Sequence, residues 1–169
     1  MQIQQQLTIN APAKRVWEIL GPQFANVSEW TSPVYFSQAS HNDVVAQNAP
    51  CSGRVCETDL GNFDEQITRY DEVNKIISYT AKGDKMPFFV TKMSNTWTVI
   101  PLSNDKCRAD MCMEISLMPV FNLLMGSMMR MKLGGAIKTS TEELKYFAEN
   151  GVPHPRKLEA QQQNQLKAV

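Results

Sequence analysis

The order of hydrophobic patterns along this chain restricts its fold more than any single motif does. One strand pattern and two short helical patterns come first, six strand patterns follow, and a single long helical pattern ends the series. The expected strands are residues 2–9, 34–40, 54–59, 62–73, 75–82, 88–102 and 106–118. Because no strands alternate with long helices as in βαβ units, we expect one antiparallel sheet of six to seven strands.

The closing helical pattern runs from Val120 to Phe147, with apolar residues spaced by three, four or seven positions. A helix of this length measures about 42 Å, and a strand of about 13 residues measures about 43 Å. One such helix therefore matches the longest strands of the sheet. The sequence predicts an α+β domain over residues 1–149, with the helices on one side of the sheet.

Two details of the helical end remain open. Gly134 and Gly135 lie inside the helical pattern, which indicates either a bend or close approach to the sheet, or a tolerated local weakness. Residues 150–169 contain two prolines and a glutamine tract. We expect them to form a polar, flexible C-terminal tail.

Charge and composition argue against several partners. Seventeen basic residues balance seventeen acidic ones, so there is no electrostatic reason to expect nucleic acid as a partner. The N-terminal residues lack the basic segment and apolar stretch of a signal peptide. We therefore expect a cytoplasmic protein.

The four cysteines are expected to be free thiols. Both Cys51–Cys56 and Cys107–Cys112 have a spacing that resembles a metal-binding pattern. In a strand, however, an offset of five places Cys107 and Cys112 on opposite faces, where they cannot hold one ion. We expect no metal and no cofactor.

Five of the ten methionines lie between Met118 and Met131. This segment also contains Pro119, Arg130 and Lys132, and a membrane span needs about 20 mostly apolar residues, so we expect no integral membrane segment. A copper site would need support from histidine or cysteine, and the segment contains neither. The methionines therefore either fill an ordinary core or line a pocket that adapts its shape to apolar ligands.

Several local motifs, taken in order, resemble the START/SRPBCC superfamily, in particular its polyketide cyclase/dehydrase branch. The resemblance covers residues 2–149 and rests on NAPAKRVWEIL (10–20), SEWTSPVYFSQ (28–38), SGRVCETD (52–59), FDEQITRYDEVNKIISY (63–79) and NTWTVIPL (95–102). It implies a helix-grip fold, in which a curved antiparallel sheet wraps around the long C-terminal helix. It also implies two short helices after the first strand, and a deep hydrophobic cavity between the sheet and the long helix.

Side-chain alternation along the strands and position along the helix select most of the residues that would face such a cavity. Tyr35 is included because its ring could donate a hydrogen bond to a ligand. Met128 and Met131 lie further around the helix and are candidates for a lid or for the surface of a homodimer. The expected lining residues are Tyr35, Ile67, Met93, Asn95, Trp97, Met111, Met113, Leu117, Met125 and Met129.

Catalysis in the cavity would depend on residues other than histidine. His41 lies in a polar loop and His154 lies between two prolines, so neither is placed as a base. The weak catalytic candidates are Glu65, Arg69 and Tyr79. Because side chains alternate between the two faces of a strand, Glu65 and Arg69 share the face of Ile67. They could equally reach water at the rim of the sheet, or Glu65 could pair with a cation on a neighbouring strand.

Three functions remain open at this point. The first is binding of a small hydrophobic molecule such as a lipid, an aromatic compound or a polyketide-like compound. The second is a cyclase, aromatase or dehydratase in which cavity Glu, Arg, Tyr and Asn side chains orient or deprotonate a poly-β-ketone. The third is an interaction protein that presents a methionine-rich groove to a partner chain. The lack of a pocket histidine and the scarcity of converging polar residues favour binding.

Overall fold

The computed structural model describes residues 1–167, without the side chains of Asn122, Leu124 and residues 165–167. Within that range seven strands form one antiparallel sheet in the order β1-β7-β6-β5-β4-β3-β2. The strands are β1 (Gln2–Ile9), β2 (Val34–Ala39), β3 (Gly53–Thr58), β4 (Gly61–Asp71), β5 (Ile76–Gly83), β6 (Val90–Pro101) and β7 (Cys107–Leu117). The helices are α1 (Ala13–Leu20), the 3₁₀ helix η1 (Phe24–Glu29), α2 (Pro119–Asn150) and α3 (Pro155–Lys167).

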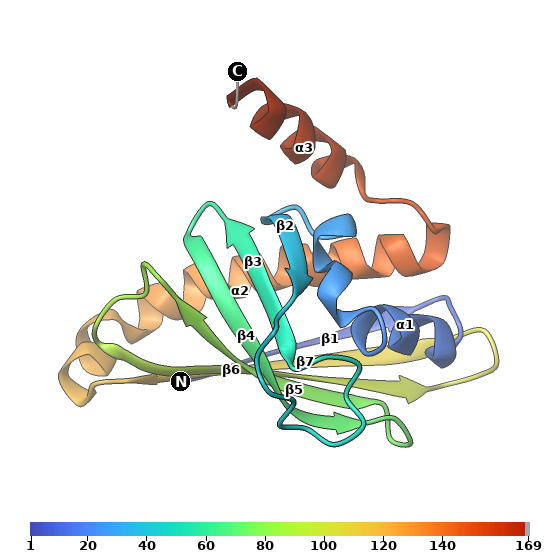
Figure 1. Cartoon of the computed structure of the whole chain (residues 1–169), viewed down its shortest axis with the longest axis horizontal. Coiled ribbons are helices and arrows are strands. Elements are labelled where there is room, and N and C mark those ends of the chain that lie inside the picture. The colour runs from blue at the N-terminus through green and yellow to red at the C-terminus, as the bar shows by residue number, and fades with distance from the viewer. Residues whose placement is uncertain (168–169) are drawn as a thin grey trace.

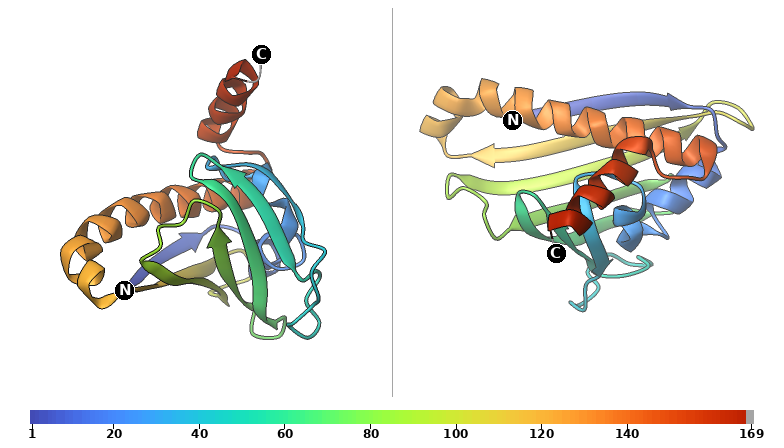
Figure 2. Two further views of the ribbon diagram at one scale, coloured as in Figure 1. Left: turned by 60° about the vertical axis from the view of Figure 1, so that its left-hand side comes forward. Right: turned by 90° about the horizontal axis from the view of Figure 1, so that it is seen from above.

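The sheet curves around the long helix α2, while α1 and η1 close one end of the concave side (Figures 1 and 2). This arrangement confirms the predicted helix-grip fold, including the two short helices after the first strand. The core lies between the sheet, α1 and the C-terminal half of α2. Its most buried apolar side chains are Ile9, Val16, Ile19, Ile67, Ile77, Val99 and Leu144.

The strand pairing has three irregularities. One lies in β6 against β7, between Val90 and Lys92, and the other two lie beside predicted inward-facing side chains. β4 shifts its register against β5 between Ile67 and Arg69, and β2 shifts against β3 between Val34 and Phe36. Because side chains alternate along a strand, one extra residue sends the following side chains to the opposite face. Inward-facing positions counted from the sequence are therefore displaced beyond these two points.

The segment expected to be a polar tail contains a helix. α2 ends at Asn150, and the following Gly151 has the left-handed φ of 73° that favours glycine at a helix C-terminus. After a short turn, α3 continues over Pro155–Lys167 and extends away from the body near β2 (Figure 1). The segment is polar as predicted, but this helix was not predicted from the sequence. Its flexibility remains a prediction.

Gly134 and Gly135 do not mark a close approach of α2 to the sheet. A Cβ atom added at either position would meet nothing within 4 Å. Replacing Gly135 with alanine is expected to raise the free energy of unfolding by about 0.5–1 kcal/mol, because alanine loses less backbone entropy in a helix. Urea denaturation would measure the change.

Gly53→Ala is the control for this substitution, since its Cβ would lie 1.9 Å from the Glu65 backbone oxygen and must destabilise the protein. A loss of stability in Gly135→Ala would instead indicate that α2 needs the glycine for a bend.

Among residues 1–167 we find no helix with the length and apolar character needed to span a bilayer.

Candidate functional site

A cavity of about 260 Å³ lies between the concave face of the sheet, the two short helices and α2. Most of its wall is apolar or aromatic, because the strands that cross this face alternate a large inward side chain with an outward polar one. The principal apolar lining residues are Phe24, Val27, Trp30, Phe63, Met93, Trp97, Met111, Met113, Leu133 and Ile137. Such a wall suits a small, mainly apolar guest.

Five of the six predicted residues of β6 and β7 line this cavity: Met93, Asn95, Trp97, Met111 and Met113. In these strands Asn95 lies opposite Met113 and Trp97 lies opposite Met111, with no irregularity between them. Side-chain alternation counted from the sequence therefore holds along the part of β6 and β7 that pairs without interruption, from Lys92 of β6 onward.

The catalytic candidates divide between the cavity and the surface. Glu65 and Tyr79 line the cavity. Arg69 lies beyond the register shift of β4, and its side chain is 55% exposed and paired with Asp71. The prediction that Arg69 shares the inward face of Ile67 is wrong, because the extra residue at the bulge turns Arg69 outward.

Tyr35 also lies outside the cavity. Its neighbour Val34 lines the wall, so Tyr35 projects from the other face of β2 and borders a separate groove beside α3. The register shift between Val34 and Phe36 accompanies this change.

Four further predicted lining residues are absent from the wall. Ile67 is fully buried in the core, and Leu117 lies at the end of β7, opposite Val90. Met125 and Met129 precede Leu133, which is the first residue of α2 on the wall. The N-terminal part of α2 extends past the cavity, so these methionines do not line it.

Arg54, the most buried cation of the cavity wall, was not among the residues predicted from the sequence. Arg54 of β3 is 7% exposed and lies directly opposite Glu65 of β4. Its Nε donates a hydrogen bond to Glu65 Oε2, and its Nη1 donates one to the backbone oxygen of Phe24 over 2.7 Å. The cross-strand cation considered for Glu65 is therefore present, although only strand pairing reveals which residue it is.

Two aromatic rings enclose the Arg54 guanidinium. Its carbon lies 4.0 Å from the ring centroid of Phe24 and 5.3 Å from that of Tyr79, and the two rings meet edge to face at 5.0 Å. Such contacts attract a cation to the ring faces. They hold the Arg54–Glu65 pair in one place at the wall.

The charges of this pair affect the neighbouring groups. Burial by itself lowers the pKa of Arg54, but the negative charge of Glu65 and smaller contributions from Tyr79 and Cys56 give a net upward direction. Burial first, and the charge of Glu65 second, raise the pKa of Tyr79. The phenol of Tyr79 therefore stays protonated at neutral pH and can donate a hydrogen bond.

Asn95 lies next to this polar region, because it pairs with Tyr79 across β5 and β6. The residue is 4% exposed, and its Oδ1 is buried without a hydrogen-bond partner. An unpaired buried acceptor costs about 1–3 kcal/mol. In a cavity wall, a guest with a donor would remove that cost.

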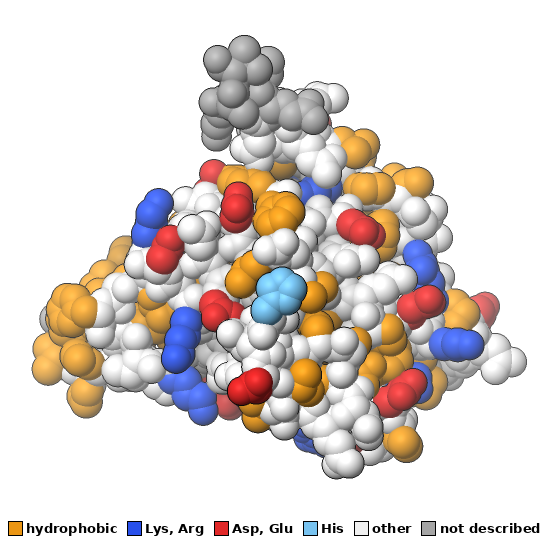
Figure 3. Space-filling view, in the orientation of Figure 1, with side chains coloured by type: hydrophobic (Ala, Val, Ile, Leu, Met, Phe, Trp, Pro, Cys, Tyr) orange, Lys and Arg blue, Asp and Glu red, His pale blue; other side chains and the backbone are white. Residues whose placement is uncertain are grey.

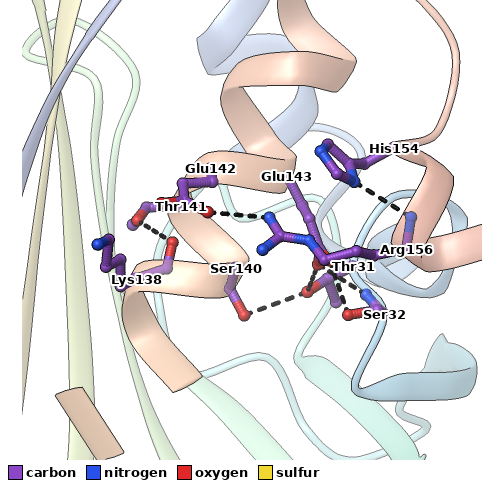
Figure 4. Close-up of polar contacts among 9 residues, drawn as sticks. All are labelled: Thr31, Ser32, Lys138, Ser140, Thr141, Glu142, Glu143, His154 and Arg156. Carbon is purple, nitrogen blue, oxygen red and sulfur yellow. Dashed lines mark hydrogen bonds and ion pairs between the residues drawn. The ribbon is translucent and has the colours of Figure 1, made fainter. Parts of the chain in front are cut away.

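A second polar cluster lies where α2, α3 and the start of β2 meet (Figure 4). Glu143 has no exposed surface, and its carboxylate accepts hydrogen bonds from the Thr31 hydroxyl at 3.2 Å, Ser32 N at 2.8 Å and Ser32 Oγ at 2.7 Å. Arg156 of α3 forms an ion pair with the same carboxylate at 3.3 Å. Four polar groups therefore contact the Glu143 carboxylate, which joins α2 to α3 and to the segment before β2.

Neither histidine belongs to the cavity wall. His41 is exposed, and His154 accepts a hydrogen bond from the Arg156 backbone N–H at the start of α3. Over the described part of the chain, no group of three His, Cys, Asp or Glu residues could hold a metal ion. The polar and ionisable side chains of the cavity wall are Thr31, Arg54, Thr58, Asp59, Glu65, Tyr79, Asn95 and Ser140.

Comparison with known proteins places the chain among proteins of this architecture. The sequence model of the family described as polyketide cyclase/dehydrase and lipid transport matches residues 1–149. A comparison with curated proteins found no match.

Solved structures share the fold at low sequence identity. A START superfamily protein from Mycobacterium smegmatis superposes with a TM-score of 0.71 at 16% identity, covering 88% of this chain and 97% of that one. Norcoclaurine synthase from Thalictrum flavum, in complex with a transition state analogue, has a TM-score of 0.66 at 14% identity, covering 88% and 93%. The di-domain ARO/CYC BexL has a TM-score of 0.68 at 14% identity, with 87% of this chain but 47% of that one covered. At such identities the likeness concerns the fold alone.

Proposed function

The chain belongs to the polyketide cyclase/dehydrase and lipid transport family, and from this premise we propose that it binds a small apolar molecule in the cavity beneath α2. The guest would carry one hydrogen-bond donor at its polar end. Its apolar part would lie against Trp97, Met111 and Met113, and its donor would reach Asn95.

The size and wall of the cavity support this ligand class. A cavity of roughly 150 Å³ holds one benzene ring, so a volume of about 260 Å³ suits a molecule of one or two rings or a short chain. The unbranched methionine side chains of the wall allow it to adjust to guests of different shape.

The unpaired Oδ1 of Asn95 is the observation that carries the proposal. Folding leaves this acceptor buried without a partner, and among the polar cavity groups Glu65 already has Arg54 as its partner. A hydroxyl or amine of the guest would restore the missing hydrogen bond, whereas a purely apolar guest would leave the acceptor unpaired.

Calorimetric titration with 1-naphthol and with 1-methylnaphthalene tests this expectation, because the two probes have nearly the same shape and only naphthol has a donor. The wild-type protein is expected to bind naphthol roughly tenfold more tightly. Asn95→Leu is expected to abolish that preference and to keep the wild-type affinity for 1-methylnaphthalene.

Ser94→Ala serves as the control, since Ser94 precedes Asn95 on β6 and lies outside the cavity wall. Equal affinity of the wild-type protein for both probes would contradict the role of Asn95. Failure to bind either probe would contradict the cavity as a site for guests of this size.

Native mass spectrometry of protein purified from its own host tests the function more broadly. A stoichiometric apolar molecule with one polar end would support binding. A matched pair of linear and cyclised or dehydrated molecules would instead support an enzyme.

An enzyme is the second candidate, because a carboxylate and a protonated phenol lie on the same wall. Glu65 would accept a proton from the substrate, and Tyr79 would donate a hydrogen bond to a carbonyl oxygen. If the protein turns over a poly-β-ketone, Tyr79→Phe should lose this turnover and still bind the apolar probe. That result would favour an enzyme.

A further inference from the structure

Exposed hydrophobic side chains gather at the end of the molecule where α2 begins (Figure 3). They come from the loop between β5 and β6 and from the first turns of α2, which we call together the apolar end. Its members are Phe88 (74% exposed), Val120 (66%), Leu123 (87%), Met128 (42%) and Met131 (73%). Contiguous apolar groups on a surface mark a site of interaction.

Aromatic contacts hold the two parts of the apolar end together. The ring of Phe121 in α2 stacks on Phe89 at 4.7 Å and meets Phe88 edge to face at 5.4 Å. The loop before β6 and the start of α2 therefore present their exposed side chains on a common base.

The segments that carry the apolar end contain basic residues and no acidic ones, although the whole chain is neutral. Residues 85–104 and 115–141 contain no aspartate or glutamate, leaving the remaining twelve basic residues with all seventeen acidic ones in the rest of the chain. Five basic side chains belong to these segments, and all are exposed: Lys85, Lys92, Arg130, Lys132 and Lys138. Among the described side chains, none of these five forms an ion pair.

Three acidic residues border these segments. Asp84 precedes Lys85, and its carboxylate accepts a hydrogen bond from the backbone N–H of Asn62 in β4. Glu114 is exposed on β7, and Glu142 lies four residues beyond Lys138 in α2, paired with Arg156. The five basic side chains therefore outnumber the acidic ones in and beside the segments that carry the exposed apolar groups.

We propose that the apolar end docks on the surface of an anionic lipid bilayer. Phe88, Val120, Leu123 and Met131 would enter the boundary between headgroups and acyl chains, while the basic side chains would contact lipid phosphates. An interfacial helix with apolar groups and flanking Lys and Arg side chains binds membranes in this way. A bilayer accepts both kinds of group at once.

The charge argues for lipid over a second copy of the chain. Pairing two apolar ends would bring basic side chains of both copies near one another without an acidic partner from the same segments, and like charges at an interface oppose association. An anionic bilayer supplies the opposite charge.

Docking at this end would place one side of the cavity near the membrane. Leu133, the first cavity residue of α2, follows the exposed Met131 by two positions. An apolar guest could then pass between the bilayer and the cavity over a short path. The docking itself does not depend on what the cavity holds.

Flotation with lipid vesicles tests the proposal. The full chain is expected to bind vesicles of phosphatidylcholine mixed with phosphatidylserine at least about tenfold more tightly than vesicles of phosphatidylcholine alone, and high salt is expected to weaken the binding. The double variant Val120→Ser/Leu123→Ser is expected to lose about tenfold or more in affinity, since these side chains would otherwise leave water on docking.

A charge variant, Lys132→Glu, complements the apolar variant, and each of the two has a matched control. Val73→Ser/Leu102→Ser changes the same two residue types at exposed positions outside the apolar end and is expected to bind as the wild type does. Lys132→Glu is expected to weaken binding by about fivefold or more. Lys106→Glu, at the far hairpin between β6 and β7, is expected to have little effect.

The proposal would be overturned if the wild type, Val120→Ser/Leu123→Ser and Lys132→Glu bound anionic vesicles equally well, or if the wild type did not bind them. A dimer in solution that Leu123→Ser dissociates, together with no vesicle binding, would assign the apolar end to a second copy instead. Because naphthol binding uses the cavity alone, it distinguishes failure of the membrane proposal from failure of the cavity proposal.

Discussion

Replacing Arg54 with methionine is expected to lower the free energy of unfolding by about 3–5 kcal/mol, because it leaves the Glu65 carboxylate in the cavity wall without its cation. The two side chains are 9% and 13% exposed. The substitution also removes the hydrogen bond to the Phe24 backbone oxygen and the contacts with two aromatic rings. Urea denaturation followed by circular dichroism measures the loss.

A double-mutant cycle separates the ion pair from the packing of the arginine side chain. Arg54→Met/Glu65→Leu is expected to recover most of the stability, since an apolar pair in place of a buried ion pair is often neutral or better. Arg108→Met provides the comparison for an exposed pair, because Arg108 is 39% exposed beside Asp110, and its loss is expected to cost less than about 1 kcal/mol. An equally small cost for Arg54→Met would indicate that water in the cavity stabilises Glu65 by itself.

Replacing Glu143 with leucine is expected to destabilise the protein by about 3 kcal/mol and to release α3 from the body. The Thr31 hydroxyl and the Ser32 backbone N–H would lose their acceptor inside the fold, and Arg156 would lose one of its two carboxylate partners. Denaturant unfolding measures the first effect. Limited proteolysis between residues 150 and 160 measures the second.

Glu142→Gln is the matched control at the neighbouring position. Glu142 pairs with Arg156 as well, but it is 42% exposed, so its loss is expected to cost less than about 1 kcal/mol and to leave α3 in place. Unchanged protease resistance in Glu143→Leu would show that Lys157, which is fully buried and donates a hydrogen bond to the Val34 backbone oxygen at 2.7 Å, is sufficient to hold α3.

The sequence predicted the sheet and the long helix because both depend on local periodicity. Alternation along residues 90–101 and 107–117 identified the strands that carry Asn95, Trp97 and Met111 onto the cavity wall. Once two uninterrupted strands pair in register, their inward positions follow from counting. The prediction was wrong for Arg69, since no sequence pattern marked the irregularity in β4. It was also wrong for Tyr35, which follows the inward-facing Val34 and therefore lies on the outward face of β2.

The sequence alone therefore determined the fold class, the order of the elements and the inward face of β6 and β7. The tertiary structure decided that Arg54 is the partner of Glu65, that Asn95 Oδ1 stays unpaired, and that α2 carries its methionines past the cavity to the apolar end. It also decided that residues 155–167 form a helix joined to Glu143 through Arg156. Periodicity acts between near neighbours in the chain, whereas each of these features depends on residues brought together from distant segments by strand register and helix packing.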